Sequence, residues 1–226
     1  VMTHLACADD PNDRTTLQQV RSFGAALGSF TGDVSIANSA GVLLWAQTLT
    51  SSELLDYKGE NWVRPGLALY GASPIPGRSA QEFGLEPAMS FESRLIAIRT
   101  LKKGAQVGYG ATWQADRETV LGVAAVGYGD GYPRHLETGT PVVVNGHRVQ
   151  LVGRVSMDMI TVDLTDVPAA CVGDRVVLWG ANPGIEEIAA RAGTIPYEVM
   201  CGLTQRTRHR FIDGEKSRLR AARIRQ

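Results

Sequence analysis

Apolar positions in the first third of the chain alternate between a helix-like and a strand-like spacing. Leu17, Val20, Phe23 and Leu27 recur at roughly helical intervals, with Gln18, Gln19 and Arg21 on the opposite face. Residues 34–37 form a short apolar run that predicts a strand, and residues 38–41 are expected to start the next helix. A further apolar stretch, interrupted at residues 64–66, covers residues 63–70 and is expected to form the next strand. Strand and helix signals in this order predict parallel βα units.

The pattern changes between residues 71 and 88, where prolines and glycines mark a linker. Beyond it, apolar runs predict strands at residues 91–101, 119–126, 141–144, 147–152, 159–164 and 175–179. Asn145-Gly146, between two of these runs, is a strong hairpin signal. Helices are expected at residues 185–192 and from Pro196 onward. We therefore predict two domains: an α/β segment at residues 1–85 and a mostly antiparallel β domain with a basic tail at residues 86–226.

The α/β segment is short for any complete fold of its class. A (β/α)8 barrel needs about 250 residues. If residues 1–85 belong to such a barrel, most of it lies outside this sequence or is supplied by something that packs against it. The first residues, Val1 to Asp9, read as the end of a buried strand running into a loop, without a starting Met or a signal-peptide profile. We therefore expect a preceding N-terminal part.

Composition and charge exclude several classes of function. The 226 residues are 44% hydrophobic and 20% charged, which is typical of a globular protein. Lys+Arg and Asp+Glu both number 23, so no overall field favours nucleic acid or an acidic membrane. Residues 204–226 are basic, and a solvated tail is preferred there over a nucleic-acid arm. The three cysteines and four histidines match no disulfide framework or metal-ligand spacing, which favours a reducing compartment without a metal site.

Two motifs of the α/β segment are candidate ligand sites. Ser39 follows a strand at a helix start, where a hydroxyl and backbone N–H groups converge on an anion, although capping by Asn38 explains the same residues. Arg64 lies between apolar neighbours, so its charge needs a partner, either a structural salt bridge or a ligand. Pro65 and Gly66 let the backbone approach a ligand closely.

The β-rich part contains further candidates. Tyr109 stands between two glycines, so its ring either projects toward a ligand or anchors the packing of the turn. A phenol with a pKa near 10 is a poor base at pH 7 unless a cation stabilises the phenolate. Residues 127–134 are expected to form an ordered surface loop. Met157 and Asp158 lie where the chain turns, and a backbone N–H there would receive a carboxylate or simply close the turn. Tyr197, near a helix start, faces either the core or an anion.

The order and spacing of these motifs resemble one family, the alanine racemases, which are pyridoxal-phosphate enzymes built from a barrel and a β domain. The resemblance covers roughly residues 1–210. The matching motifs, in chain order, are Met2-Thr3-His4, Ala37-Asn38-Ser39-Ala40, Arg64-Pro65-Gly66-Leu67-Ala68-Leu69-Tyr70-Gly71, Gly108-Tyr109-Gly110, Gly127-Tyr128-Gly129-Asp130-Gly131-Tyr132, Ser156-Met157-Asp158 and Pro196-Tyr197-Glu198. It implies the C-terminal portion of a (β/α)8 barrel followed by a β domain.

The resemblance also implies a role for each matching residue. Pyridoxal 5'-phosphate would be bound by His4, Asn38, Ser39, Arg64, Gly66, Leu67 and Tyr197. Tyr109, from the partner subunit of a homodimer, would be the catalytic acid/base on one face of the substrate. The backbone N–H of Met157 would bind the substrate carboxylate. A narrow opening that admits only a small amino acid would be lined by Asp9, Tyr128, Arg134, Arg154, Asp158 and Ile195.

In the family, the cofactor-binding lysine that serves the other face precedes the segment matched here. Racemisation needs an acid/base on each face of Cα, so the chain alone is expected to be inactive. The whole enzyme would interconvert L- and D-alanine in the cytoplasm and supply D-alanine for cell-wall peptide. Two alternatives stay open: a broader amino-acid racemase of the same fold, and a non-catalytic dimerisation or binding module. Neither nucleic acid nor membrane is an expected partner.

Overall fold

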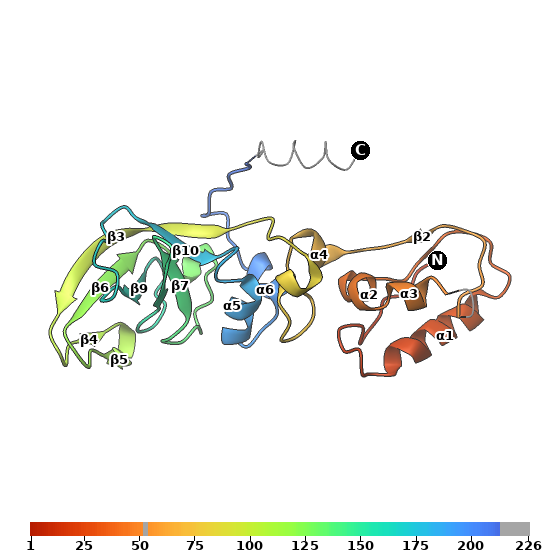
Figure 1. The fold of residues 1–226 in the computed structure, drawn as a ribbon, viewed down its shortest axis with the longest axis horizontal. Coiled ribbons are helices and arrows are strands. Elements are labelled where there is room, and N and C mark those ends of the chain that lie inside the picture. Colours follow the sequence, from red (N-terminus) through yellow and green to blue (C-terminus); the bar gives the residue numbers. More distant parts are fainter. Residues whose placement is uncertain (52–53, 213–226) are drawn as a thin grey trace.

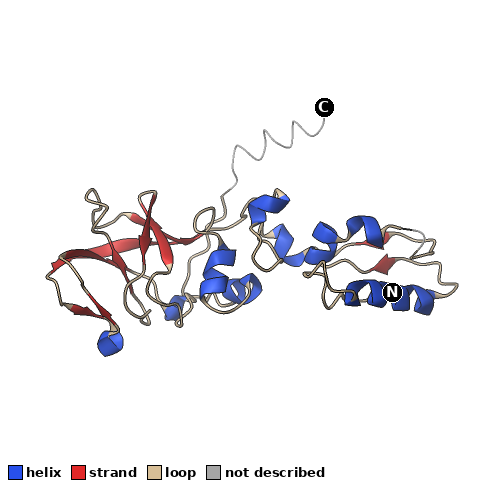
Figure 2. Cartoon of the chain, turned by 60° about the horizontal axis from the view of Figure 1, so that its bottom comes forward, coloured by secondary structure: helices blue, strands red, loops and turns tan. Residues whose placement is uncertain are grey.

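The computed structural model describes residues 1–51 and 54–212. The molecule is elongated, with an α/β segment at one end and a β-rich domain at the other (Figure 1). The short helices α4, α5 and α6 lie between the two (Figures 1 and 2). Of the basic tail, residues 213–226 lie outside the described part of the chain. No described helix is both long and apolar enough to cross a bilayer.

The α/β segment consists of parallel strands with helices packed on them. Its elements are α1 (Thr15–Leu27), β1 (Val34–Ser35), α2 (Ser39–Leu44), α3 (Ala46–Leu49), β2 (Asn61–Trp62) and α4 (Gly66–Leu69). β1 pairs in parallel with β2 and, through a single bridge, with Met2. Val20, Phe23 and Leu27 of α1 are buried, as their helical spacing predicts. The parallel βα units predicted from the apolar pattern are confirmed.

One prediction for this segment is wrong. The apolar stretch at residues 63–70 is not a strand, because β2 ends at Trp62 and α4 begins at Gly66. Pro65 precedes the helix and lacks the N–H that a strand ladder requires. The run is also not uniformly buried: Leu67 is 2% exposed, whereas Leu69 is 71% exposed.

The β-rich domain is built on one six-stranded antiparallel sheet in the order β8-β7-β10-β3-β6-β9. Its strands are β3 (Phe91–Leu101), β6 (Thr119–Ala124), β7 (Pro141–Val144), β8 (His147–Gln150), β9 (Ile160–Asp163) and β10 (Arg175–Trp179). A bridge between Leu151 and Val162 joins the two edges, so the sheet curls into a near-barrel. Asn145 and Gly146 turn between β7 and β8 with positive φ angles of 50° and 81°, as expected for the predicted hairpin.

Several short elements complete the chain. A small hairpin, β4 (Gln106–Val107) and β5 (Trp113–Gln114), encloses the 3-10 turn η2 (Tyr109–Ala111); two further 3-10 turns are η1 (Ala80–Phe83) and η3 (Tyr128–Asp130). The predicted late helices are α5 (Ile185–Arg191) and α6 (Pro196–Cys201), the second with Pro at its first position. η1 lies within the predicted linker, and a capping box of Ser79 and Glu82 caps its N-terminal end.

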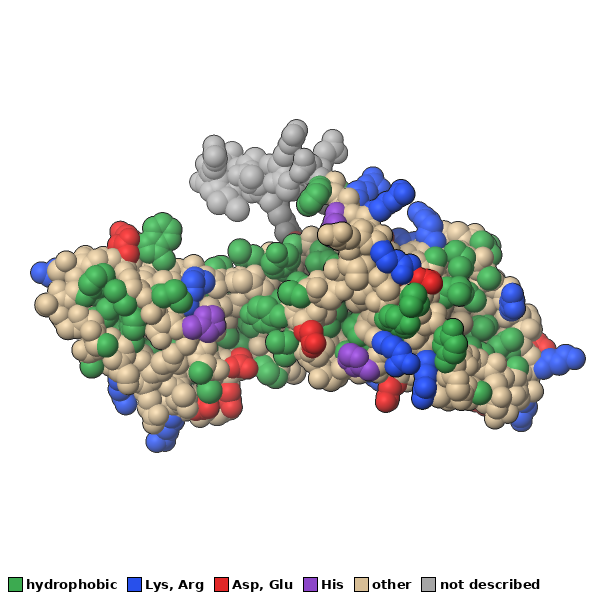
Figure 3. Space-filling view, turned by 180° about the vertical axis from the view of Figure 1, so that it is seen from behind, with side chains coloured by type: hydrophobic (Ala, Val, Ile, Leu, Met, Phe, Trp, Pro, Cys, Tyr) green, Lys and Arg blue, Asp and Glu red, His purple; other side chains and the backbone are tan. Residues whose placement is uncertain are grey.

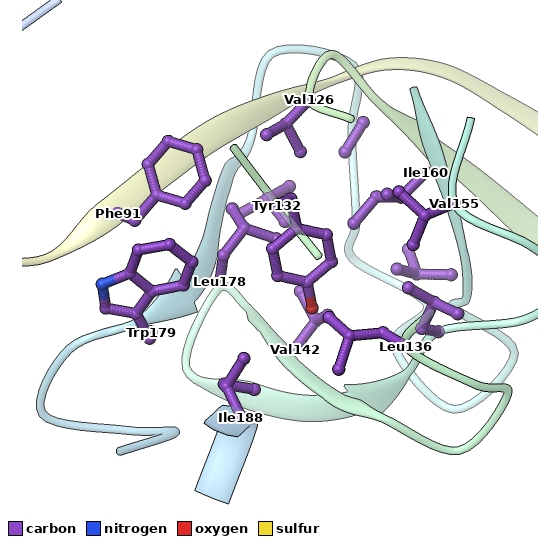
Figure 4. Close-up of a cluster of buried hydrophobic side chains, with 14 of the residues drawn as sticks. Phe91, Val126, Tyr132, Leu136, Val142, Val155, Ile160, Leu178, Trp179 and Ile188 are labelled. Carbon is purple, nitrogen blue, oxygen red and sulfur yellow. The ribbon is translucent and has the colours of Figure 1, made fainter. Parts of the chain in front are cut away.

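The cores of the two parts overlap at α4. The α/β core runs from Leu5 to Ile75, whereas Leu67 and Ala72 pack into the β-rich core. The β-rich core contains Tyr132, which is fully buried beside Trp179 at a ring-centroid distance of 6.3 Å (Figure 4). The predicted surface loop at residues 127–134 is therefore wrong at this residue. Gly131, at a φ of 105°, turns the chain so that the ring enters the core, and burial raises the pKa of the Tyr132 phenol.

Candidate active site

The first cluster of predicted site residues surrounds Arg64, just after β2. Its Nη1 donates to Ser35 Oγ at 2.5 Å and its Nη2 to the Thr3 carbonyl at 2.8 Å. Nη2 also lies 3.3 Å from Nδ1 of His4. Within the described residues no carboxylate pairs with this guanidinium, so a structural salt bridge does not explain it. Its Nε–H group has no acceptor in the same part of the chain and is free to donate to a ligand.

His4 is held by a residue that the sequence pattern does not single out. The Gln19 side chain, on α1, accepts from Ala6 N at 3.1 Å and donates to the His4 carbonyl at 2.5 Å and to Thr3 Oγ1 at 3.2 Å. The polar face predicted for this helix therefore turns Gln19 toward the N-terminal segment rather than only toward solvent. Helical spacing cannot distinguish a polar residue that contacts another segment from one that faces solvent, because both environments suit a polar side chain.

Ser39, Gly66 and Tyr197 form a small cradle beside this cluster. A methyl group built on Gly66 would lie 3.9 Å from Cε1 of Tyr197 and 4.0 Å from Oγ of Ser39. Ser39 is fully buried and its Oγ accepts from Ala68 N at 3.1 Å, while its hydroxyl hydrogen has no acceptor among the described residues. The N–H of Leu67 likewise finds no acceptor there. The cradle therefore presents donors around a space that a side chain on residue 66 would enter.

Asn38 has the structural role that composition alone favours. Its side chain accepts from Gly41 N at 2.9 Å and caps α2, and it donates to the Leu5 carbonyl at 3.3 Å. It also lines a cavity of about 560 Å³ together with His4, Tyr197, Asp9 and Ile195. The cavity lies between the N-terminal loop, residues 73–77 and helices α5 and α6. Five of the predicted site residues thus meet around one hollow.

The second cluster is in the β-rich domain and centres on Tyr109. The Tyr109 side chain is 72% exposed, between Gly108 and Gly110 at φ angles of 79° and 74°. A methyl group on Gly110 would lie 3.6 Å from Nη1 of Arg154, so this guanidinium packs on the turn. Tyr109 and Arg154 line an apolar groove that also includes Met159. The Tyr109 ring projects from this turn, as the flanking glycines predict.

Met157 lies in a loop next to η3. Gly129 N donates to the Met157 carbonyl at 2.8 Å and Tyr128 N to the Ser156 carbonyl at 3.0 Å. The Met157 side chain is half exposed, and its own N–H has no acceptor within the described part of the chain. Arg206 forms ion pairs with Asp130 and Asp158 across the two loops. An unpartnered N–H at this turn can receive a carboxylate.

The two clusters do not meet within one chain. The β4–β5 hairpin that carries Tyr109 and the α2 region that carries Ser39 lie toward opposite ends of the molecule (Figure 1). The residues predicted to line one opening divide in the same way: Asp9 and Ile195 line the cavity, whereas Tyr128, Arg154 and Asp158 lie with the second cluster, and Arg134 is exposed after η3. No metal-binding group of three His, Cys, Asp or Glu side chains occurs among residues 1–51 and 54–212.

Exposed apolar and basic side chains occur together over the β-rich end (Figure 3). The exposed apolar residues include Ile96, Tyr109, Met157 and Met159. Large apolar side chains left in water near a candidate site are typical of a surface that another molecule covers.

Comparison with known proteins identifies the family. Residues 1–74 match the model described as alanine racemase, N-terminal domain, and residues 88–211 match alanine racemase, C-terminal domain. The chain is 52% identical over 206 residues to an alanine racemase of Shewanella amazonensis (91% of this chain, 54% of the relative) and 48% identical over 215 residues to one of Halorhodospira halophila (95% and 56%).

Solved structures agree with this assignment. The biosynthetic alanine racemase of Pseudomonas aeruginosa superposes with a TM-score of 0.84 at 45% identity, covering 93% of this chain and 56% of that one. The alanine racemase of Bartonella henselae with covalently bound pyridoxal phosphate gives 0.79 at 32% identity, covering 94% and 56%. The chain thus spans about half the length of the relatives it matches. Its fold is the C-terminal part of the α/β barrel followed by the antiparallel β domain, and the chain belongs to the alanine racemase family.

Proposed function

We propose that this chain forms the C-terminal part of an alanine racemase that interconverts L- and D-alanine with pyridoxal 5'-phosphate. The observation that carries the proposal is the meeting of Gly66, Ser39 and Tyr197 beside the Arg64–His4 contact. These residues come from four separate segments. A structural role for any single one of them does not require this convergence.

The residues of the first cluster fit this cofactor. The open space at Gly66, the free N–H of Leu67 and the hydroxyls of Ser39 and Tyr197 suit a phosphate. The free Nε–H of Arg64 suits a ring nitrogen, and a guanidinium that keeps its proton would leave that nitrogen unprotonated. His4, fixed by Gln19, would flank the ring. When bound, pyridoxal phosphate supplies an electron sink for negative charge at the substrate Cα.

The second cluster supplies the groups that act on the substrate. The Tyr109 phenol would remove or return the proton at Cα on one face. The free N–H of Met157 would hold the substrate carboxylate. Tyr128, Arg134, Arg154 and Asp158 of one subunit, with Asp9 and Ile195 of the other, would restrict the opening to a small amino acid.

Because the two clusters lie far apart in one chain, we propose a homodimer in which each site combines both. The apolar surface around Tyr109 would then be covered by the partner. The second acid/base is the lysine that the family resemblance implies; of the described lysines, Lys58, Lys102 and Lys103, none contacts either cluster. We therefore propose that the 226 residues alone do not racemise alanine. Three free cysteines agree with a cytoplasmic enzyme, and a domain boundary near residue 85 stays a prediction.

Tyr109→Phe in the complete racemase polypeptide tests this function. Removing one acid/base is expected to lower racemisation by about 10²–10⁴-fold. The loss in kcat/KM must be equal in both directions because L- and D-alanine have the same free energy. Exchange of the α-hydrogen with solvent deuterium should survive for one enantiomer only, through the other acid/base, while the cofactor absorbance is unchanged. Loss of exchange for both enantiomers, or full racemisation, would contradict the role of Tyr109.

A further inference from the structure

We propose that Arg206 is a positioning residue for the substrate carboxylate, holding the Met157 N–H in place and cancelling the negative charge around it. The inference rests on the proposed function and extends it to a residue outside the predicted motifs. Arg206 belongs to the basic end of the chain, for which the sequence favours only a solvated tail.

The geometry of Arg206 is that of a clamp between two loops. Its Nη2 donates to Asp158 Oδ1 at 2.5 Å, and its Nε lies 3.4 Å from Oδ1 of Asp130. Asp130 is itself fixed, because its Oδ2 accepts from Gly127 N at 2.9 Å and its side chain is only 16% exposed. A guanidinium engaged by two carboxylates on separate loops resists movement of either loop.

The backbone beneath this ion-pair network is closely packed. Gly129 donates to the Met157 carbonyl, and Thr204 Oγ1 donates to the Gly129 carbonyl at 2.8 Å. A methyl group built on Gly129 would clash with the Arg206 guanidinium and crowd the Met157 carbonyl, so the guanidinium lies directly on this backbone. Three segments of the chain, at residues 127–131, 156–159 and 204–206, are thus tied around the peptide that carries the free Met157 N–H.

Charge gives Arg206 a second effect. Without its guanidinium, Asp130 and Asp158 would leave two unpaired negative charges beside the site proposed for a carboxylate, and like charges at close range repel. Because its Nη2 and Nε are held by the two aspartates, we assign Arg206 a positioning role and not a catalytic one. Its loss should therefore weaken substrate binding more than it slows proton transfer.

The test compares Arg206→Gln with Arg208→Gln in the complete racemase polypeptide loaded with cofactor. Arg208 is exposed two residues further on and loses the same charge. Arg206→Gln is expected to raise KM about tenfold for both enantiomers with kcat changed less than about threefold. Arg208→Gln should leave both constants near the wild-type values. Adding Asp158→Asn to Arg206→Gln should recover part of the KM loss, which a purely structural defect would not.

A measurement independent of catalysis accompanies the kinetics. Hydrogen exchange, followed by mass spectrometry in the peptide covering residues 126–132, should accelerate in Arg206→Gln and not in Arg208→Gln. Arg206→Lys, which keeps the charge, provides the comparison if the glutamine variant does not fold. Unchanged exchange would overturn the clamp, and faster exchange with unchanged KM would overturn the substrate role. An inactive wild-type enzyme would instead overturn the proposed function. The hydrogen-exchange comparison would still show whether Arg206 restrains these loops.

Discussion

At the scale of the residue, Gly66 defines a site by the side chain it lacks. Its φ is not in the positive range, so its backbone does not require glycine. A methyl group there would lie 3.9 Å from Tyr197 and 4.0 Å from Ser39 without a clash, so the protein alone does not require glycine; the phosphate proposed for this space would. Gln19 and Arg206 also act on a site indirectly. Gln19 fixes the backbone of His4, and Arg206 holds the loops of Asp130 and Asp158 together. A residue can be essential to a site while touching no ligand.

Gly66→Ala is expected to weaken cofactor binding without unfolding the protein. The added methyl would occupy the space proposed for the phosphate, and crowding of this kind costs about 1–3 kcal/mol, which corresponds to a Kd raised about 5- to 150-fold. The measurement is a titration of apoenzyme with pyridoxal phosphate, followed by absorbance. Leu69→Ala, on the exposed side of the same short helix, serves as the control. Equal affinity in the Gly66 and control variants would move the phosphate away from this cradle.

At the scale of the element, β3 organises the β-rich domain. Its 11 residues pair with β10 on one side and β6 on the other, so both halves of the sheet depend on it. Across the β3–β10 pair, Arg175 binds Glu92 through two nitrogens, one of them Nε at 2.6 Å. The pair fixes the strand register near the end that faces α5 and α6.

Glu92→Gln is expected to make stability depend on pH in a defined way. The Arg175 guanidinium holds the pKa of the Glu92 carboxyl below its usual range, with desolvation opposing the shift. Since the folded pKa is depressed, the stabilisation is present above the unfolded value near 4.3 and is lost as the pH falls through the folded value. The pair is partly exposed, so about 0.5 kcal/mol is expected at pH 7.

The measurement is the urea midpoint of wild type and Glu92→Gln at pH 7 and near pH 3. The two proteins should differ at pH 7 and converge in acid. Glu118→Gln, an exposed carboxylate, is the matched control and should match wild type at both values. A difference between wild type and Glu92→Gln that persists in acid would assign the effect to packing instead of charge.

At the scale of the whole molecule, the separation of the two clusters is the governing feature. The first lies where the α/β segment meets helices α5 and α6, the second lies in the β-rich domain, and the elongated shape keeps them apart (Figure 1). Two-fold dimers place the same surface of each copy against its counterpart, so one contact would complete two sites at once. The proposed racemase therefore depends on assembly as much as on folding.

Mixing two inactive variants tests this dependence. Tyr109→Phe disables the second cluster and Arg64→Leu the first, so each homodimer should be inactive. Co-expressed chains should recover about a quarter of wild-type activity, because half of the dimers are hybrids and each hybrid has one intact site. Hybrids purified by two different tags should carry all of the recovered activity. Absence of recovery in such hybrids would indicate that each site is built from one chain.

The elements with strong local signals, and the order of the motifs, could be predicted from the amino-acid sequence. Helix α1, the β7–β8 hairpin and strand β3 follow from periodicity and turn chemistry, which act over a few residues. The partners of individual side chains could not be predicted in this way: Gln19 holds His4, Arg206 bridges two loops, and Tyr132 is buried within a glycine-rich segment. These contacts join residues far apart in the chain, and packing, not local pattern, selects which polar group meets which.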